Sequence, residues 1–159
     1  ERRSRIMADR FPLVVDSTNN NIKELPSGDN LDMTGSGFAN LTTIAANAYN
    51  ETYVTASASG SPPTVTIDCS AGTHFLRTLA TGTNTFVFSN APASKAYGFV
   101  LKLTQDSTDR AVTWPGTVDW AAGTAPTISS GNGKVDIFVF NTFDAGTIWY
   151  GFTAGQAMA

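Results

Sequence analysis

The residues of this chain that could do chemistry gather between positions 100 and 140. Four carboxylates and two indoles stand there in a stretch rich in proline and glycine: Asp106, Asp109, Asp119, Asp136, Trp114 and Trp120. Two carboxylates on either side of a glycosidic bond can cleave it, and an indole can stack on a sugar ring. Aspartates in turns, however, commonly accept hydrogen bonds from nearby backbone N–H groups. We therefore expect these aspartates to be structural and the chain not to be an enzyme.

The two tryptophans admit two interpretations. In the first, Trp114 and Trp120 stay exposed on loops and contact a receptor, a host-surface glycan or another subunit, since an amphipathic ring suits such contacts. In the second, both rings fold back and close the end of the β-domain, because large apolar side chains seldom stay exposed without a reason. The sequence favours the second interpretation and leaves the first open.

The single histidine and the single cysteine exclude several kinds of site. A Ser-His-Asp triad or a metal centre would need further residues at suitable spacing around His74, and none is visible. His74 is therefore expected to be a hydrogen-bonded residue at the end of a strand. Cys69 has no partner for an intrachain disulfide, and the alternation around it indicates a small buried hydrophobe. The sequence predicts no cofactor, no metal ion and no catalytic residue.

The first ten residues carry a cluster of positive charge. Arg2, Arg3, Arg5 and Arg10 are four of the ten basic residues, and Phe11 follows directly. Either this segment is a solvated tail, or it is an arm whose guanidinium groups bind an acidic neighbour. In the second case these five residues form the partner-binding part of the arm. Whether the first six residues belong to the native start stays open.

Composition narrows the class of protein. Charged residues make up 14% of the chain, against about 25% in an average soluble domain. A thinly charged, hydroxyl-rich surface is common in all-β extracellular and virion proteins. The net charge of -3 argues against nucleic acid as a partner of the whole chain. No apolar run approaches the roughly 20 residues of a spanning helix, so we expect no insertion into a membrane.

Period-two alternation predicts the strands that position these residues. Three of them cover residues 97–103, 134–141 and 147–152, and further short strands recur about every ten residues from position 63 onward. Both faces of the strand over 134–141 are apolar, which predicts a central strand or one at a subunit contact. Regularly spaced strands separated by turns are typical of a sandwich. The predicted fold class is all-β, an antiparallel β-sandwich or jelly roll preceded by an extended N-terminal arm.

The N-terminal part of the chain has a different character. Residues 11–15 and 22–25 are typical of short strands, and a turn rich in Asp, Ser, Thr and Asn separates them. Large apolar residues are too few here to offset an ordering cost of about 1–2 kcal/mol per residue. We therefore expect residues 1–60 to form an arm that attaches to another subunit and residues 61–159 to form the sandwich domain. The Ser- and Pro-rich residues 57–63 would join the two or form an exposed loop at the sandwich edge.

Two stretches of the chain resemble structural proteins of tailed bacteriophages. Residues 7–16, MADRFPLVVD, and residues 22–35, IKELPSGDNLDMTG, resemble the N-terminal segment of virion proteins from phages of marine cyanobacteria. The motifs LTQD at 103–106, VTWP at 112–115 and WYGF at 149–152, together with Trp120, are similar to a β-sandwich of phage tail fibres and related virion proteins. Together the two resemblances cover most of the chain.

The resemblance implies a non-enzymatic virion structural protein, located on the capsid surface or on the tail. The first hypothesis is a capsid decoration (cement) protein, a homotrimer that binds the major capsid protein and straps neighbouring subunits with its arm. The second is a short tail fibre or fibre-tip protein, which docks on tail proteins and meets the host surface through the loops around Trp114 and Trp120. A free carbohydrate-binding module is disfavoured because it has no use for the arm. The short chain, without a repetitive shaft, favours the first hypothesis.

Overall fold

The computed structural model describes residues 13–16, 21–24 and 46–158. Strands β1 (Leu13–Asp16) and β2 (Asn21–Glu24) form an antiparallel hairpin, in which Leu13 stands opposite Glu24. Both strands lie where the sequence pattern predicts them, on either side of the predicted turn. The residues assigned to partner binding in the arm lie outside the described residues: Arg2, Arg3, Arg5, Arg10 and Phe11.

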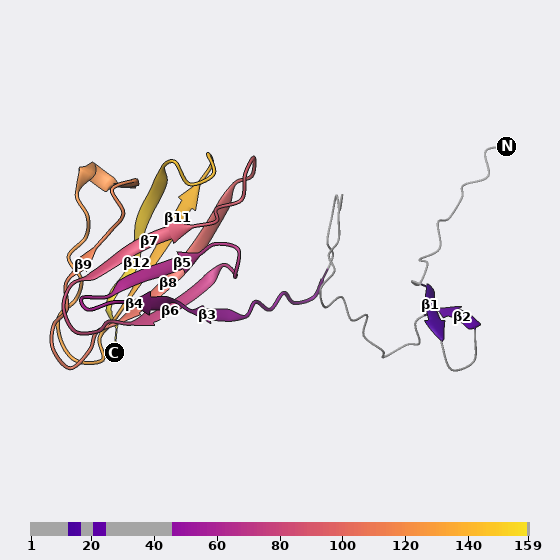
Figure 1. Cartoon of the computed structure of the whole chain (residues 1–159), viewed down its shortest axis with the longest axis horizontal. Coiled ribbons are helices and arrows are strands. Elements are labelled where there is room, and N and C mark those ends of the chain that lie inside the picture. Colours follow the sequence, from indigo (N-terminus) through magenta and orange to yellow (C-terminus); the bar gives the residue numbers. More distant parts are fainter. Residues whose placement is uncertain (1–12, 17–20, 25–45, 159) are drawn as a thin grey trace. The chain divides into compact units, whose positions relative to one another are not determined.

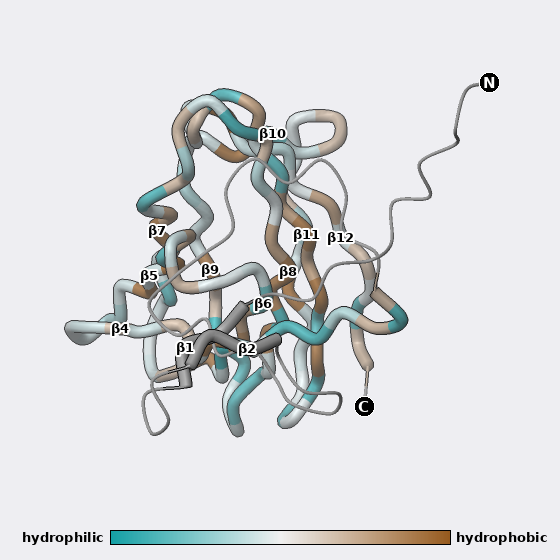
Figure 2. Tube along the Cα trace, turned by 90° about the vertical axis from the view of Figure 1, so that its right-hand side faces the viewer, coloured by the Kyte–Doolittle hydropathy of each residue, from teal (hydrophilic) through white to brown (hydrophobic). Residues whose placement is uncertain are grey.

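Two sheets packed face to face make up the second compact unit of the chain, Ala48–Ala159 (Figure 1). The larger sheet has six strands in the order β10 (Val118–Trp120), β12 (Trp149–Met158), β11 (Val135–Thr142), β8 (Tyr97–Thr104), β6 (His74–Thr78) and β3 (Tyr53–Thr55). The smaller sheet has four strands in the order β4 (Ser57–Ser59), β5 (Thr64–Asp68), β7 (Asn84–Ser89) and β9 (Val112–Thr113). A 3-10 turn, η1 (Ala121–Gly123), follows β10. Figure 2 shows β5, β7 and β9 on one side and β8, β11 and β12 on the other.

The all-β class and the two sheets are confirmed, while the strand directions differ from the antiparallel expectation. From β5 to β10 the chain alternates between the smaller and the larger sheet. Each time the chain comes back to a sheet, the new strand runs parallel to the previous strand of that sheet. Thus β5–β7, β7–β9 and β6–β8 are parallel neighbours. β11 then pairs antiparallel with both β8 and β12. Apolar alternation is the same in parallel and antiparallel strands, so the sequence pattern does not encode direction.

The sandwich begins earlier in the chain than predicted. β3 and β4, which fall within the residues assigned to the arm, are edge strands of the larger and the smaller sheet. All three residues of β4 are exposed, and the strand joins the sheet by pairing with β5. Backbone pairing needs no apolar side chain, so periodicity could not reveal this strand. Residues 48–60 therefore belong to the compact unit rather than to the arm.

Large apolar side chains fill the space between the two sheets. The fully buried ones include Val65, Ile67 and Phe86 from the smaller sheet and Phe75, Phe99, Leu101, Leu103, Phe138, Phe140 and Trp149 from the larger. The rings of Phe99 and Phe140 stack with centroids 5.0 Å apart, and the ring of Phe88 meets each of them at 5.0 Å in an edge contact. β11, whose two apolar faces predict a central strand, lies between β8 and β12.

A buried carboxylate fastens the last strand of the larger sheet. β12 continues to Met158, beyond the predicted residues 147–152. On the inner face of β11, Asp136 accepts hydrogen bonds from the backbone N–H groups of Ser129 at 2.7 Å and Ala157 at 3.0 Å. These bonds join β11 to the loop before it and to the end of β12. An aspartate that the sequence placed among possible catalytic residues therefore anchors a loop and the end of the C-terminal strand.

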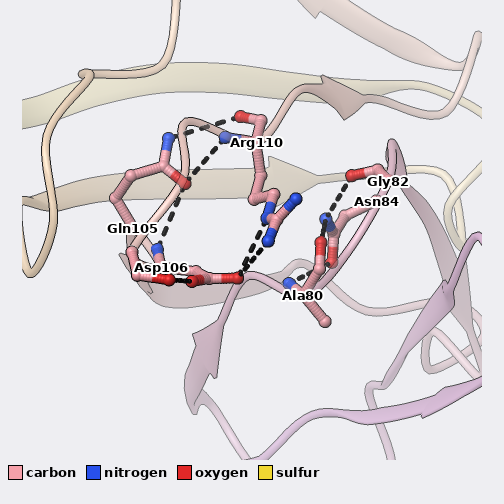
Figure 3. A network of polar contacts seen from close by, with 7 residues as sticks. Ala80, Gly82, Asn84, Gln105, Asp106 and Arg110 are labelled. Carbon is pink, nitrogen blue, oxygen red and sulfur yellow. Dashed lines mark hydrogen bonds and ion pairs between the residues drawn. The ribbon is translucent and has the colours of Figure 1, made fainter.

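Two buried amides fix the paths of loops that leave the sheets (Figure 3). Asn84 donates to the carbonyl oxygens of Ala80 and Gly82 at 2.9 and 3.2 Å and accepts from the N–H of Ala80 at 3.1 Å. Gln105 donates to the carbonyl oxygen of Arg110 at 3.3 Å and accepts from the N–H of the same residue at 3.0 Å. An unpaired buried amide costs about 1–3 kcal/mol, so these bonds favour one loop conformation over its alternatives.

The stability of this part of the fold depends on pH through the Asp106 carboxyl group. A hydrogen bond from the Ser107 hydroxyl, with a second from the Arg110 guanidinium, lowers the pKa of Asp106 from 3.8 to about 2. A carboxyl with a lowered pKa in the folded state stabilises the fold above its ordinary pKa. This contribution is therefore lost as the pH falls from about 4 to about 2.

We expect an NMR titration of the Asp106 carboxyl to show a midpoint at about 2 in the folded chain. Ser107→Ala should raise that midpoint, because it removes the largest of the interactions that favour the charged carboxylate. A midpoint at 3.8 in the native chain would show that neither hydrogen bond forms in solution.

Candidate functional site: the outer face of the six-stranded sheet

The two indoles are folded back against the aromatic core, as in the second interpretation of the sequence. Trp114 and Trp120 are half-buried. The ring of Trp114 lies 5.1 Å from that of Phe138, and the ring of Trp120 lies 5.6 Å from that of Phe140. A Cβ atom on Gly151 would come within 2.7 Å of the Trp120 ring, so the missing side chain of Gly151 makes room for this indole. Only part of each ring is left for a receptor or a second subunit.

The four aspartates do not converge on one site. Asp136 is buried on the inner face of β11, whereas Asp119 is exposed on the opposite side of the same sheet. Asp106 forms an ion pair with Arg110 at 2.8 Å, and Asp109 accepts a hydrogen bond from a backbone N–H at 2.6 Å. Asp106, Asp109 and Asp136 thus fasten loops, in the way that the sequence predicts.

His74 is the first residue of β6 and is hydrogen-bonded, as expected. Its Nδ1 lies 2.5 Å from Oε2 of Glu51, and the Thr73 hydroxyl donates to the same carboxylate. The bond from Thr73, assisted by His74, lowers the pKa of Glu51. A catalytic triad needs the hydroxyl and the carboxylate on opposite ring nitrogens. Here both approach Nδ1, so the geometry is not that of a triad.

Cys69 is buried, and burial raises the pKa of its thiol from 9.0 to about 11. Since the thiolate is the reactive form, we expect native Cys69 to react with a thiol-specific disulfide reagent at pH 8 about a hundredfold more slowly than in the unfolded chain. The measurement is the rate of labelling with and without urea. Equal rates in both states would mean that the thiol is accessible in the folded chain.

One surface hollow of about 390 Å³ lies between the loops that follow β8 and β10. Its charged and amide side chains, Gln105, Asp109 and Arg110, are already hydrogen-bonded or ion-paired within the chain, and its other polar side chains are the hydroxyls of Thr127 and Ser130. It therefore offers few free groups to a ligand. Within residues 13–16, 21–24 and 46–158, no group of three or more His, Cys, Asp or Glu side chains is placed to hold a metal ion. No helix of the same residues is long and apolar enough to cross a bilayer.

The side of the six-stranded sheet that is turned away from the smaller sheet is apolar along its middle. Strand register sets Phe152 of β12 beside Val139 of β11, and Val139 beside Val100 of β8. Phe152 is 55% exposed and Tyr150 is 41% exposed, although both belong to a strand whose other side is buried. We call this surface the outer face; its apolar residues are Tyr53, Leu76, Val100, Val135, Ile137, Val139, Tyr150 and Phe152.

Further exposed apolar side chains border the outer face at the turn between β11 and β12. Phe143 is 71% exposed, and its ring lies 6.3 Å from that of Tyr150. Ile148, which precedes β12, is also exposed. Contiguous apolar surface of this kind marks a site of contact with another protein or a ligand.

His74, paired with Glu51, lies between Tyr53 and Val100 on the outer face, and two further charged side chains flank its apolar residues. Lys102 is exposed on β8 beside Ile137 of β11. Asp119 is exposed on β10 beside Tyr150 of β12. The two opposite charges thus stand on different sides of the apolar centre.

The outer side of the smaller sheet is different in kind. Strand register sets Thr64 of β5 beside Thr85 of β7, and Thr85 beside Thr113 of β9. Thr66 stands beside Val87, the one large apolar residue exposed on β7. The hydroxyl groups of the smaller sheet can hydrogen-bond to water, whereas the exposure of the apolar outer face of the larger sheet to water is unfavourable. This contrast within one molecule makes the outer face of the larger sheet the candidate contact surface.

Alternation in the sequence did not identify this site. It placed Ile148, Tyr150 and Phe152 on one side of a strand and Trp149 and Gly151 on the other, without showing which side is inside. The structure buries Trp149 and exposes Tyr150 and Phe152. The available signal was the two-sided apolar pattern of residues 134–141, which predicted a central strand or a subunit contact.

Comparison of the chain with protein family models, with curated proteins and with solved structures finds no match.

Proposed function

We propose that this chain is a non-enzymatic structural protein of a bacteriophage virion, and within the virion a capsid decoration protein. The sequence resemblance of residues 7–35 and of the sandwich motifs supports the phage assignment. The role is mechanical: the sandwich lies on the capsid surface, and the N-terminal segment straps it to the major capsid protein and to sibling subunits.

The observation that carries an assembly role is the apolar outer face. Tyr150 and Phe152 present aromatic surface from a rigid, centrally supported sheet, and few charges interrupt it. Specific interfaces bury about 1,000 Å² or more in total, and they are enriched in aromatic side chains at their centre. A rigid sheet with such a face is suited to permanent contact with another protein surface.

A short tail fibre or fibre-tip protein is the second candidate, and the loop-borne indoles are the feature that favours it. Trp114 and Trp120 retain some exposed surface. Their packing on Phe138 and Phe140, however, commits most of each ring to the fold. The geometry therefore supports decoration better than receptor contact through these two residues.

Copy number per virion tests the proposal most directly. The number of chains is measured by quantitative mass spectrometry of purified virions against the major capsid protein. A decoration protein occupies the head lattice, so hundreds of copies are expected. A few tens of copies would favour the tail candidate, and none would overturn both.

Deletion of residues 1–31 tests the strap. We expect the deleted chain to keep its β-sheet circular dichroism, because the sandwich is a separate compact unit, and to lose binding to purified capsids. A second variant replaces Arg2, Arg3, Arg5 and Arg10 with glutamine at unchanged chain length and should also bind capsids more weakly if the guanidinium groups make the contact. Full capsid binding by the deleted chain would exclude the arm as the strap.

A further inference from the structure

We infer that a second copy of this chain covers the outer face, related to the first by a two-fold axis that passes over the Val139–Phe152 pair. This inference rests on the proposed function only in treating the outer face as an assembly surface. Three features support it: the exposed area, the positions of Lys102 and Asp119, and the resulting angle between the sheets.

The exposed apolar area is of the size that a dimer needs. Tyr53 and Phe143 are each 71% exposed, and Phe152 and Tyr150 are about half exposed. Since a large aromatic side chain can bury about 150–250 Å², the exposed parts of these four side chains amount to roughly 350–600 Å². A standard interface buries about 800 Å² on each partner, so these four side chains supply about half to three quarters of one side.

Lys102 and Asp119 of the outer face are too far apart to pair with each other within one chain. Register places Asp119 level with Tyr150, Tyr150 level with Asn141, and Asn141 level with Gly98 on β8. Lys102 is four residues further along β8. The two side chains are therefore about 14 Å apart across three strand spacings and about 13 Å apart along the strands.

The midpoint between the two charges falls on the apolar centre. Half of the displacement from Asp119 to Lys102 ends midway between β12 and β11. Along the strands, this point lies two residues from the Tyr150–Asn141 pair, in the direction of Lys102. The residues at that point are Phe152 and Val139, which are paired in register. A two-fold axis lying over this pair and perpendicular to the line that joins the charges sets Lys102 of each copy opposite Asp119 of the other.

This axis also produces a sheet packing that proteins use. Because the line between the charges runs at about 45° to the strands, the axis does so as well, and the strands of the two copies cross at about 90°. Orthogonal crossing is one of the two preferred arrangements of packed sheets, with a spacing of about 10 Å. An extended lysine together with an aspartate spans that spacing. One two-fold rotation thus buries the aromatic residues and forms both ion pairs, in an isologous interface.

Sedimentation equilibrium of the full chain over a range of concentrations tests the inference. The unmodified chain is expected to reach twice the chain mass of 16.8 kDa. Lys102→Asp makes both positions acidic and Asp119→Lys makes both basic, so each variant by itself meets like charges in the dimer. We expect each to associate about tenfold or more weakly than the unmodified chain at low salt.

Mixing the two variants in equal amounts is the decisive arm of the experiment. In the mixed pair every acidic position meets a basic one, so association should return to within a few-fold of the unmodified chain. High salt should weaken the mixed pair and partly restore each single variant, since it screens attraction and repulsion alike. Thr85→Glu, which adds a carboxylate to the outer side of the smaller sheet, is the control and should associate normally.

Three results would overturn the inference. They are a chain that stays monomeric at all concentrations, the homotrimer that the sequence resemblance implies, and a dimer whose two charge variants gain nothing from being mixed. A monomer would mean that the outer face is covered by another segment of the chain or by another protein. These results do not depend on the copy number in the virion. A dimer in solution together with no copies in the virion would contradict the proposed function and leave this inference standing.

Discussion

Replacing Phe140 with alanine is expected to lower the free energy of unfolding by about 3–5 kcal/mol. Phe140 is fully buried, stacks on Phe99 and contacts Phe88, Trp114 and Trp120. Removing its ring leaves a cavity between two sheets that cannot close without moving both. Urea unfolding followed by tryptophan fluorescence measures the loss.

Phe152→Ala is the matched control for this prediction. It makes the same chemical change on the neighbouring strand, but Phe152 is 55% exposed on the outer face and leaves no cavity. We expect a loss of stability below about 1 kcal/mol for the monomeric chain, together with weaker self-association. Equal losses for the two variants would contradict the assignment of inner and outer sides to the larger sheet.

Trp114→Ala is expected to cost about 3 kcal/mol of stability, because the indole is a structural part of the sandwich. The ring lies 5.1 Å from both Phe86 and Phe138 and 5.4 Å from Trp120, so it connects the smaller sheet to the larger. Thermal unfolding followed by circular dichroism measures the effect.

The conservative variant Trp114→Phe separates the two roles considered for this residue. Phenylalanine keeps the apolar contacts, so most of the stability should return. A host-contacting indole would behave differently: Trp114→Ala would leave the melting temperature unchanged and reduce adsorption of virions to cells. That pair of results would move the proposal from the capsid to the tail.

Several features of the fold follow from local chemistry and were predictable. Alternation in residues 97–103 and 134–141 gave two adjacent central strands, because the period of two is a property of every strand. Cys69 and His74 lay where their surroundings indicated, one buried directly after β5 and one at the start of β6. Turn residues marked the ends of these strands, since their backbone preferences are local.

Other features depend on partners that are distant in the sequence. The exposed strand β4 forms because its backbone pairs with that of β5, and no side chain in Ser57–Ser59 indicates this pairing. Parallel pairing of β5 with β7 arises from a chain that crosses between sheets, which apolar alternation cannot show. Asp136 is a structural residue because the loop before β11 and the end of β12 donate hydrogen bonds to its carboxylate.

The sequence by itself determined the all-β class, the positions of the main strands and the two sides of each. Only the tertiary structure decided which side of the larger sheet is covered, since alternation assigns residues to sides but not sides to the interior. That decision folds Trp114 and Trp120 inward and leaves Tyr150 and Phe152 outside. It depends on the smaller sheet, which can pack against only one side of the larger and leaves the other free for a partner.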